Sequence, residues 1–102
     1  MLRHYNVLIF PKELLLIDDL TNFEKILLAF LIDLEYNRRY IQIDVNYLTS
    51  SINKPFSKII KSFNSLEQKC YLTYALTGEY KEIKKPNILI DFSVNIEKIY
   101  NQ

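Results

Sequence analysis

The chain has 102 residues with a formal net charge of +1, and 49% of the residues are hydrophobic and 25% charged. This length corresponds to one compact domain, and this composition is too apolar for a disordered chain. The chain has one glycine, one cysteine and one histidine, which exclude a glycine-rich phosphate-binding loop, a disulfide framework and a structural zinc site. We therefore expect a single domain that is not an enzyme and uses no metal and no cofactor.

Basic residues are concentrated in the second half of the chain. Residues 1–50 contain five Lys+Arg and seven Asp+Glu, whereas residues 51–102 contain eight and five. The longest apolar run covers residues 26–32, which is far shorter than the ~20 residues that cross a bilayer. The apolar stretch of residues 7–10 is too short for a secretory signal. We expect a cytoplasmic protein with no membrane partner.

Residues 1–19 are expected to form an N-terminal strand or arm. The stretch from His4 to Phe10 is rich in β-branched and aromatic residues and stops at Pro11, a pattern typical of a short strand. The segment from Lys12 to Asp19 contains four consecutive apolar residues. It is compatible with one helical turn or with a second strand, because periodicity cannot be judged over so few positions.

A long core helix is predicted from Thr21 onwards. Thr21 is a typical N-cap, and Glu24 stands in the capping-box position three residues later. Apolar residues recur at spacings of three and four, as on one face of a helix, at Phe23, Ile26, Leu27, Phe30, Leu31 and Leu34. The helix is expected to end at residues 37–39, where two arginines complement its partial negative charge.

A short strand and two further helices are predicted next. Residues 40–43 alternate between apolar and polar, which indicates a strand, and Asp44 is a suitable N-cap for a helix over residues 45–51. Residues 53–55 indicate a turn. Pro55 is favoured at the first helical position because its missing N–H has no partner there, and this third helix is expected to extend to Lys69.

The remaining residues predict a hairpin and a short helix. From Tyr71 to Leu76 the side chains alternate with period two. A charged connection follows over residues 79–86, and residues 87–92 form the returning strand. Residues 93–100 indicate a last short helix. The expected fold class is therefore α+β, with a core over residues 20–92 and a C-terminal segment over residues 93–102.

This order of elements is that of a winged helix-turn-helix, in which three helices form the core and the short strand joins the hairpin in a small antiparallel sheet. In such folds the second helix of the turn motif enters the DNA major groove. Here that helix is residues 55–69, whose Ile59, Phe63 and Leu66 form the inward stripe. The residues expected to contact duplex DNA are Lys54, Ser57, Lys58, Lys61, Ser62, Asn64, Ser65 and Gln68, together with Lys81, Lys84 and Lys85 on the wing.

The types of these residues suit a DNA surface. Lysines release counterions from phosphates, and Asn or Gln can bridge an adenine. Because neither the third helix nor the wing contains an arginine, bidentate guanine recognition is not available there, and we expect modest, salt-sensitive affinity. The alternative is that the helix face and the wing lysines are only solvated and keep the protein soluble.

Two stretches of the chain resemble a known family. Residues 20–28, Leu-Thr-Asn-Phe-Glu-Lys-Ile-Leu-Leu, resemble the opening core helix of the winged-helix domains of plasmid and phage replication initiators and replisome organisers. Residues 57–69 are similar to their recognition helix, and residues 10–14 match the strand and Pro-Lys-Glu-Leu-like residues with which they often begin. The resemblance implies a DNA-binding module that regulates transcription or replication initiation. That family usually has a glycine after the recognition helix, whereas this chain has Cys70, which predicts a different helix end.

A winged helix can also act without DNA, as a protein interaction or dimerisation module. The surfaces would then be the apolar segments of residues 5–10 and 94–100, and a homodimer is the default expectation for either function. Cys70 is expected to be a buried packing residue. The tyrosines at positions 36, 40, 47, 71 and 74 are expected to pack beside the core, whereas Tyr5 and Tyr100 are expected to be exposed.

Overall fold

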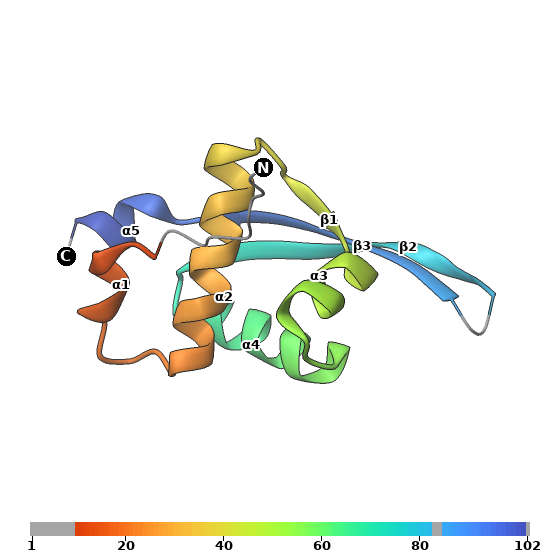
Figure 1. The fold of residues 1–102 in the computed structure, drawn as a ribbon, viewed down its shortest axis with the longest axis horizontal. Coiled ribbons are helices and arrows are strands. Elements are labelled where there is room, and N and C mark those ends of the chain that lie inside the picture. Colours follow the sequence, from red (N-terminus) through yellow and green to blue (C-terminus); the bar gives the residue numbers. More distant parts are fainter. Residues whose placement is uncertain (1–9, 83–84, 102) are drawn as a thin grey trace, which may run out of the picture.

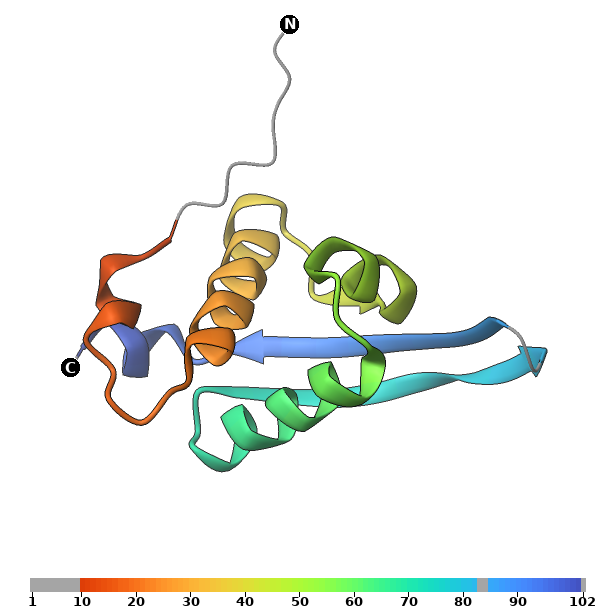
Figure 2. The same ribbon diagram turned by 60° about the horizontal axis from the view of Figure 1, so that its bottom comes forward.

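The computed structural model describes residues 10–82 and 85–101, and the side chains of these residues other than 78–87. They form a mixed α+β domain built on a three-stranded antiparallel sheet, so the expected α+β class is confirmed (Figure 1). After a turn of the view, α2 and α3 lie on one side of the sheet and α4 runs alongside β2 (Figure 2). Within the described ranges, none of the helices combines the length and the apolarity that a membrane span requires.

Helix α1 (Lys12–Leu15) is a single turn, so the segment left open between helix and strand is helical. Leu14 is fully buried, while Leu15 and Leu16 are exposed. Helix α1 packs against α2 and α5, which explains why one short turn is stable. The strand predicted from His4 onwards lies outside the described residues apart from Phe10, which packs against the core.

Helix α2 (Asn22–Ile32) begins with the predicted capping box. The Glu24 N–H donates to Thr21 Oγ1 at 3.1 Å, and the Thr21 N–H donates to Glu24 Oε1 at 2.9 Å. The buried face of α2 is centred on Leu28 and Leu31, because α2 packs against three elements, α1, α4 and β3. Ile26, which was expected to be inward, therefore lies outside this face and is 44% exposed.

The end of the core helix widens into a π-helical turn, η1 (Asp33–Asn37). Arg38 caps this turn: its N–H donates to the Asp33 carbonyl at 3.2 Å, and its Nε lies 3.5 Å from Asp33 Oδ2. The chain then turns through Arg39, which has a positive φ of 63°. The two arginines thus follow the end of the helical segment, as the sequence predicts, and Arg38 pairs with the Asp33 side chain as well as with the helix end.

Strand β1 (Gln42–Asp44), helix α3 (Val45–Ile52) and helix α4 (Phe56–Gln68) follow in the predicted order. Asp44 is the N-cap of α3, since its Oδ1 accepts from the Asn46 N–H at 2.7 Å. Asn53 closes α3 in the left-handed conformation, with φ 60°, which an asparagine adopts at low cost. Pro55 is extended and is the N-cap of α4, one position before its predicted place.

Strands β2 (Leu72–Glu82) and β3 (Lys85–Val94) form the hairpin, and β3 lies between β1 and β2. Leu76 pairs with Ile90, and Ile43 pairs with Ile90 on the other side. The strands continue through most of residues 79–86, where a loop was expected, so the hairpin projects far beyond the helices (Figure 1). Backbone pairing therefore extends further than the apolar pattern indicated, with a shift of register between Glu79 and Glu82.

The C-terminal helix α5 (Ile96–Tyr100) is shorter than predicted because residues 93 and 94 belong to β3. Its N-cap is Asn95, whose Oδ1 accepts from the Lys98 N–H at 3.1 Å. Val94 and Ile99 are buried in the domain, and Tyr100 is exposed as expected. Most of the apolar surface of the C-terminal segment is therefore used inside the domain.

The core is a single cluster to which every helix and strand contributes. Its fully buried large side chains are Leu14, Leu27, Leu28, Leu31, Leu34, Leu48, Ile59, Phe63, Leu66, Leu72, Ile90 and Ile99. Tyr71 is buried and Tyr74 is half-buried against Phe63, with ring centroids 5.1 Å apart. The prediction of packed tyrosines is wrong for Tyr36 and Tyr40, which are exposed. It holds in part for Tyr47, which is 44% exposed but has its ring centroid 6.4 Å from that of Phe30.

Cys70 contradicts both expectations made for it. It is exposed, and it adopts the left-handed conformation with φ 68°. The Tyr71 N–H donates to the Leu66 carbonyl at 2.9 Å and the Cys70 N–H to the Glu67 carbonyl at 3.0 Å, which is the hydrogen-bond pattern of a Schellman C-cap. Helix α4 therefore ends as it would with glycine at this position.

Tertiary contacts hold Cys70 in this conformation. Asn95 Nδ2 donates to the Cys70 carbonyl at 3.0 Å, and the Asn95 N–H donates to the Tyr71 carbonyl at 2.8 Å. A residue with a Cβ atom pays roughly 1–2 kcal/mol for left-handed backbone. The hydrogen bonds from the start of α5 offset that cost.

We predict that Cys70→Gly raises the free energy of unfolding by about 1 kcal/mol, because glycine removes the steric cost of the positive φ. Urea unfolding followed by circular dichroism measures this effect. Cys70→Ala is the matched control, since it removes the thiol and keeps the Cβ atom. It should leave stability nearly unchanged, and equal stabilisation by alanine and glycine would contradict the backbone explanation.

Candidate nucleic-acid interface

The outer face of α4 carries the polar residues that the sequence assigns to DNA. Ile59, Phe63 and Leu66 are fully buried, and Phe56 and Ile60 lie half-buried at the edges of this stripe. Helix α4 therefore turns the predicted apolar stripe toward the core. Its exposed polar residues, with the turn before it, are Lys54, Ser57, Lys58, Lys61, Asn64, Glu67 and Gln68, while Ser62 and Ser65 are half-buried.

The side of α4 that faces α2 is partly occupied by contacts within the domain. Lys58 Nζ lies 5.0 Å from the centroid of the Phe23 ring, so its stem packs on α2 while its charge stays at the surface. Ser62 Oγ donates to the Lys58 carbonyl at 3.1 Å. The Ser65 hydroxyl hydrogen-bonds to the Glu24 carboxylate. The hydroxyls of Ser62 and Ser65 are therefore used in contacts within the domain, although the sequence assigned both residues to DNA.

The side of α4 that faces β2 is also partly engaged. The Tyr74 hydroxyl donates to Asn64 Oδ1, and the Tyr74 N–H donates to Glu67 Oε2 at 3.3 Å. These two contacts fasten α4 to β2, the edge strand of the sheet. With Oδ1 engaged in this way, Asn64 presents its amide N–H groups outward, so it is better suited to donate a hydrogen bond than to accept one.

Ser57, Lys61 and Gln68 form the centre of the outward face, and Lys54 precedes them in the turn. Within the described part of the chain, the side chains of these four residues make no hydrogen bond or ion pair. Glu67 is the one carboxylate between residues 53 and 68, and it is turned toward β2. The turn and the first half of α4 thus present positive charge that no neighbouring carboxylate neutralises.

The lysines predicted on the wing lie outside the described side chains. Lys84 lies outside the described residues, and the side chains of Lys81 and Lys85 lie outside the described side chains. The backbone places Lys81 near the end of β2 and Lys85 at the start of β3. Both belong to the part of the hairpin that projects beyond the helices (Figure 2).

A network at the end of α4 fixes how this helix is held, and sequence reasoning missed it. Lys69 Nζ lies 3.2 Å from Oε1 of Glu24, which is only 5% exposed, and it also donates to the Asp19 carbonyl. The Tyr71 hydroxyl donates to Asp19 Oδ1 at 3.0 Å. Lys98 Nζ lies 4.5 Å from the centroid of the Tyr71 ring. The capping box located Glu24, but its pairing with a residue 45 positions away has no local signal.

The environment of this network shifts two ionisable groups. Burial by itself raises the pKa of the Glu24 carboxyl, but hydrogen bonds from Ser65, from the Thr21 N–H and from Lys69, with the charge of Lys69, hold that pKa below its ordinary value. Burial raises the pKa of the Tyr71 hydroxyl, and its hydrogen bond to Asp19 raises it further. Glu24 is therefore a charged structural residue at neutral pH.

The described residues contain no group of three or more His, Cys, Asp and Glu side chains that could hold a metal ion. Comparison with protein families, with curated proteins and with solved structures finds no match to this chain.

We predict that Glu24→Gln lowers the free energy of unfolding by about 1 to 2 kcal/mol at pH 7, because the charge-assisted contact with Lys69 is lost. The pKa of Glu24 is lowered in the folded state, so its contribution is present above the unfolded pKa and is lost as the pH falls through the folded pKa. The difference between wild type and Glu24→Gln should therefore shrink below about pH 4. Urea unfolding at several pH values measures it.

Asp18→Asn is the matched control for this experiment, because Asp18 is exposed and its side chain has no partner among the described residues. It should show little change at any pH. A difference between wild type and Glu24→Gln that stays constant from pH 7 to pH 3 would contradict the assignment of a charged, paired Glu24.

Proposed function

We propose that this protein is a winged-helix protein that binds duplex DNA with α4 in the major groove. The observation that carries the proposal is the outer face of the turn and α4, where Lys54, Lys58 and Lys61 are exposed and none of them pairs with a carboxylate of the described residues. Phosphates are the partners that such a row of unpaired lysines recognises, because each contact releases condensed counterions.

The fold supports the same function. Helix α2, strand β1, helices α3 and α4 and the hairpin follow one another in the order of a winged helix, and β1 pairs with β3 of the hairpin. The α3–α4 turn is short, and Asn53 closes α3 in the left-handed conformation. In the proposed fold the projecting hairpin is the wing, which in this class of fold follows the DNA backbone beside the recognition helix.

The proposed mechanism divides the outer face between phosphate and base contacts. Helix α4 has 13 residues, so it is about 20 Å long, and the major groove is wide enough for a helix. Lys54, Lys58 and Lys61 contact phosphates, while Ser57 and Gln68 approach base edges. Asn64, held by Tyr74, donates to an acceptor such as purine N7 or thymine O4.

Regulation of transcription or of replication initiation is the process in which we propose that the protein acts. The support is the resemblance of residues 20–28 and 57–69 to the winged-helix domains of plasmid and phage replication initiators. The 102 residues carry the DNA-binding module of such a protein. Because binding depends on lysines and includes no guanidinium on α4, we infer modest affinity that falls steeply with salt.

A protein interaction module remains the second candidate, and exposed apolar residues favour it. Leu15, Leu16 and Ile41 are more than half exposed. The N-terminal part of the surface expected for this function, residues 5–9, lies outside the described residues, and Val94 and Ile99 of the C-terminal part are buried. The interaction surface of this candidate would therefore consist of α1 and the residues before β1, which the sequence did not predict for it.

We predict that Lys61→Glu weakens binding to duplex DNA by at least about tenfold in ~50 mM salt, because a phosphate contact becomes a repulsion. Lys58→Glu should act in the same direction. The slope of log K against log salt should become shallower by roughly 1 for each lysine lost. Electrophoretic mobility shift across a salt series measures both quantities, and urea unfolding confirms that each variant remains folded.

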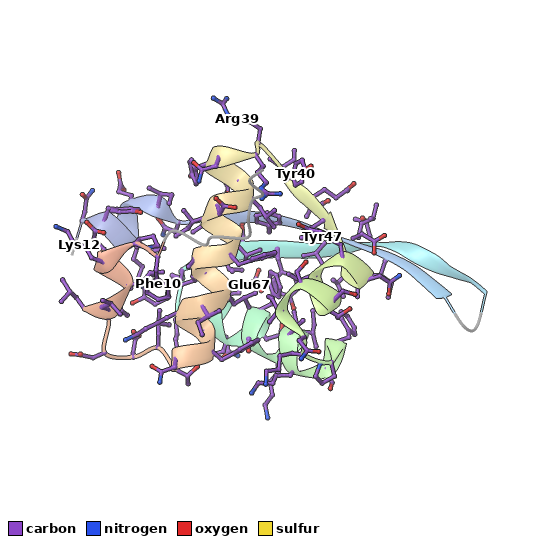
Figure 3. The ribbon with its side chains drawn as sticks, viewed as in Figure 1. Phe10, Lys12, Arg39, Tyr40, Tyr47 and Glu67 are labelled. Carbon is purple, nitrogen blue, oxygen red and sulfur yellow. The ribbon has the colours of Figure 1, made fainter. Side chains whose placement is uncertain are left out.

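The matched control is Lys12→Glu, which makes the same charge change on α1, away from α4 (Figure 3). It should lower affinity much less than Lys61→Glu. The groove assignment is wrong if both Lys58→Glu and Lys61→Glu keep the wild-type salt-dependent shift.

A further inference from the structure

The sheet has an outer face that no described element covers. Side chains alternate along the strands, and Leu72, Ile90 and Phe92 point into the core. Thr73, Ala75, Asp91 and Ser93 occupy the alternate positions, and register places Thr73 opposite Ser93 and Ala75 opposite Asp91. The face away from the helices therefore has a floor of mostly small side chains.

Two adjoining hollows open on this face. They have volumes of about 690 Å³ and 550 Å³. Thr73 and Ser93 line both of them, so the two form one shallow groove across the sheet. Ile41 borders the first hollow and Tyr36 the second, and both side chains are substantially exposed. The groove thus offers apolar contacts at its rim.

The groove is lined by carboxylates and by no lysine or arginine. Glu35 and Asp91 line the first hollow, and Glu67 and Glu97 line the second. Glu35 accepts from the Val94 N–H at 2.9 Å, Asp91 accepts from Gln42 Nε2, and Glu67 accepts from the Tyr74 N–H. These donors are neutral, and none of the four carboxylates pairs with a cation among the described residues, so their charges remain uncompensated.

The charge of this groove selects the kind of partner that it fits. A nucleic acid is repelled, since its phosphates carry the same sign as the four carboxylates. A symmetric contact with a second copy places the same carboxylates opposite one another, because a two-fold interface pairs identical patches. A partner segment with basic side chains would pair with the four carboxylates. An extended backbone would fit a shallow groove that has small side chains on its floor and apolar side chains at its rim.

We propose that the outer face of the sheet is a docking site for an extended segment of a partner protein that alternates lysine or arginine with apolar residues. Its basic side chains contact Glu35, Asp91, Glu67 and Glu97, and its apolar side chains contact Ile41 and Tyr36. Glu67, which is turned toward β2, is the one carboxylate of this site that lies on α4. The other three lie outside α4, so a partner and duplex DNA can bind the same molecule together.

The test uses the full chain and a fluorescein-labelled synthetic octapeptide of alternating lysine and valine. Fluorescence anisotropy should show saturable binding that weakens with salt, and an alternating glutamate and valine peptide should not bind. The double variant Glu35→Gln/Asp91→Asn keeps both hydrogen-bond acceptors. It should weaken binding by about tenfold, or roughly threefold for each carboxylate, as expected of exposed ion pairs.

Asp18→Asn is the matched control, because it removes a carboxylate from the loop after α1, outside the groove. It should bind the lysine peptide as the wild type does. Equal weakening by Asp18→Asn and by Asp91→Asn would show nonspecific attraction and overturn the proposal, as would binding of both peptides or of neither.

The double variant also separates this proposal from the DNA-binding function. Its α4 surface is unchanged, so its mobility shift with duplex DNA should equal that of the wild type. Loss of DNA binding together with peptide binding would mean that the two surfaces are not independent, and the docking site would be wrong. Wild-type protein that binds the peptide but no duplex would overturn only the DNA-binding function.

Discussion

The packing of α4 against α2 and the hairpin is the constraint on which the rest of the structure depends. Ile59, Phe63 and Leu66 are fully buried, and they fix the rotation of α4 about its axis. Because the side chains of a helix follow its 3.6-residue period, the residues on the opposite side, Ser57, Lys61, Asn64 and Gln68, must face solvent. The exposed lysines of α4 are therefore a consequence of the core. The pair of Lys69 and Glu24 fastens the end of the same helix to the start of α2.

Hydrogen bonds at the joint between α4 and β2 decide where the hairpin begins. Cys70 has positive φ although it is not glycine, and Asn95 holds the carbonyls of Cys70 and Tyr71. Tyr71, buried and bonded to Asp19, then directs the chain into β2. Since the hairpin extends far beyond the helices, a small change of angle at this joint would move its tip by a large distance. The network of Glu24, Lys69 and Tyr71 thus sets the relation between α4 and the hairpin.

Charge is separated between two surfaces of a nearly neutral protein. The turn and α4 carry Lys54, Lys58 and Lys61, whereas the charged residues that line the groove on the outer face of the sheet are all carboxylates. The net charge of +1 does not reveal this separation, because the positive charges of one surface offset the negative charges of the other. The proposed DNA-binding surface and the proposed docking groove both follow from it. Local charge at a surface, and not the net charge, determines which partner a surface attracts.

The amino-acid sequence by itself determined the features that depend on neighbouring residues. These include the capping box of Thr21 and Glu24, the cap of α3 at Asp44, the inward stripe of α4 and the order of helices and strands, because caps and periodicity act within a few positions. Only the tertiary structure decided the burial of Glu24 against Lys69, the left-handed Cys70, the exposure of Ile26 and Tyr47, and the acidic groove. Each of these depends on segments far apart in the chain that the fold brings together, and no local pattern records which of them meet.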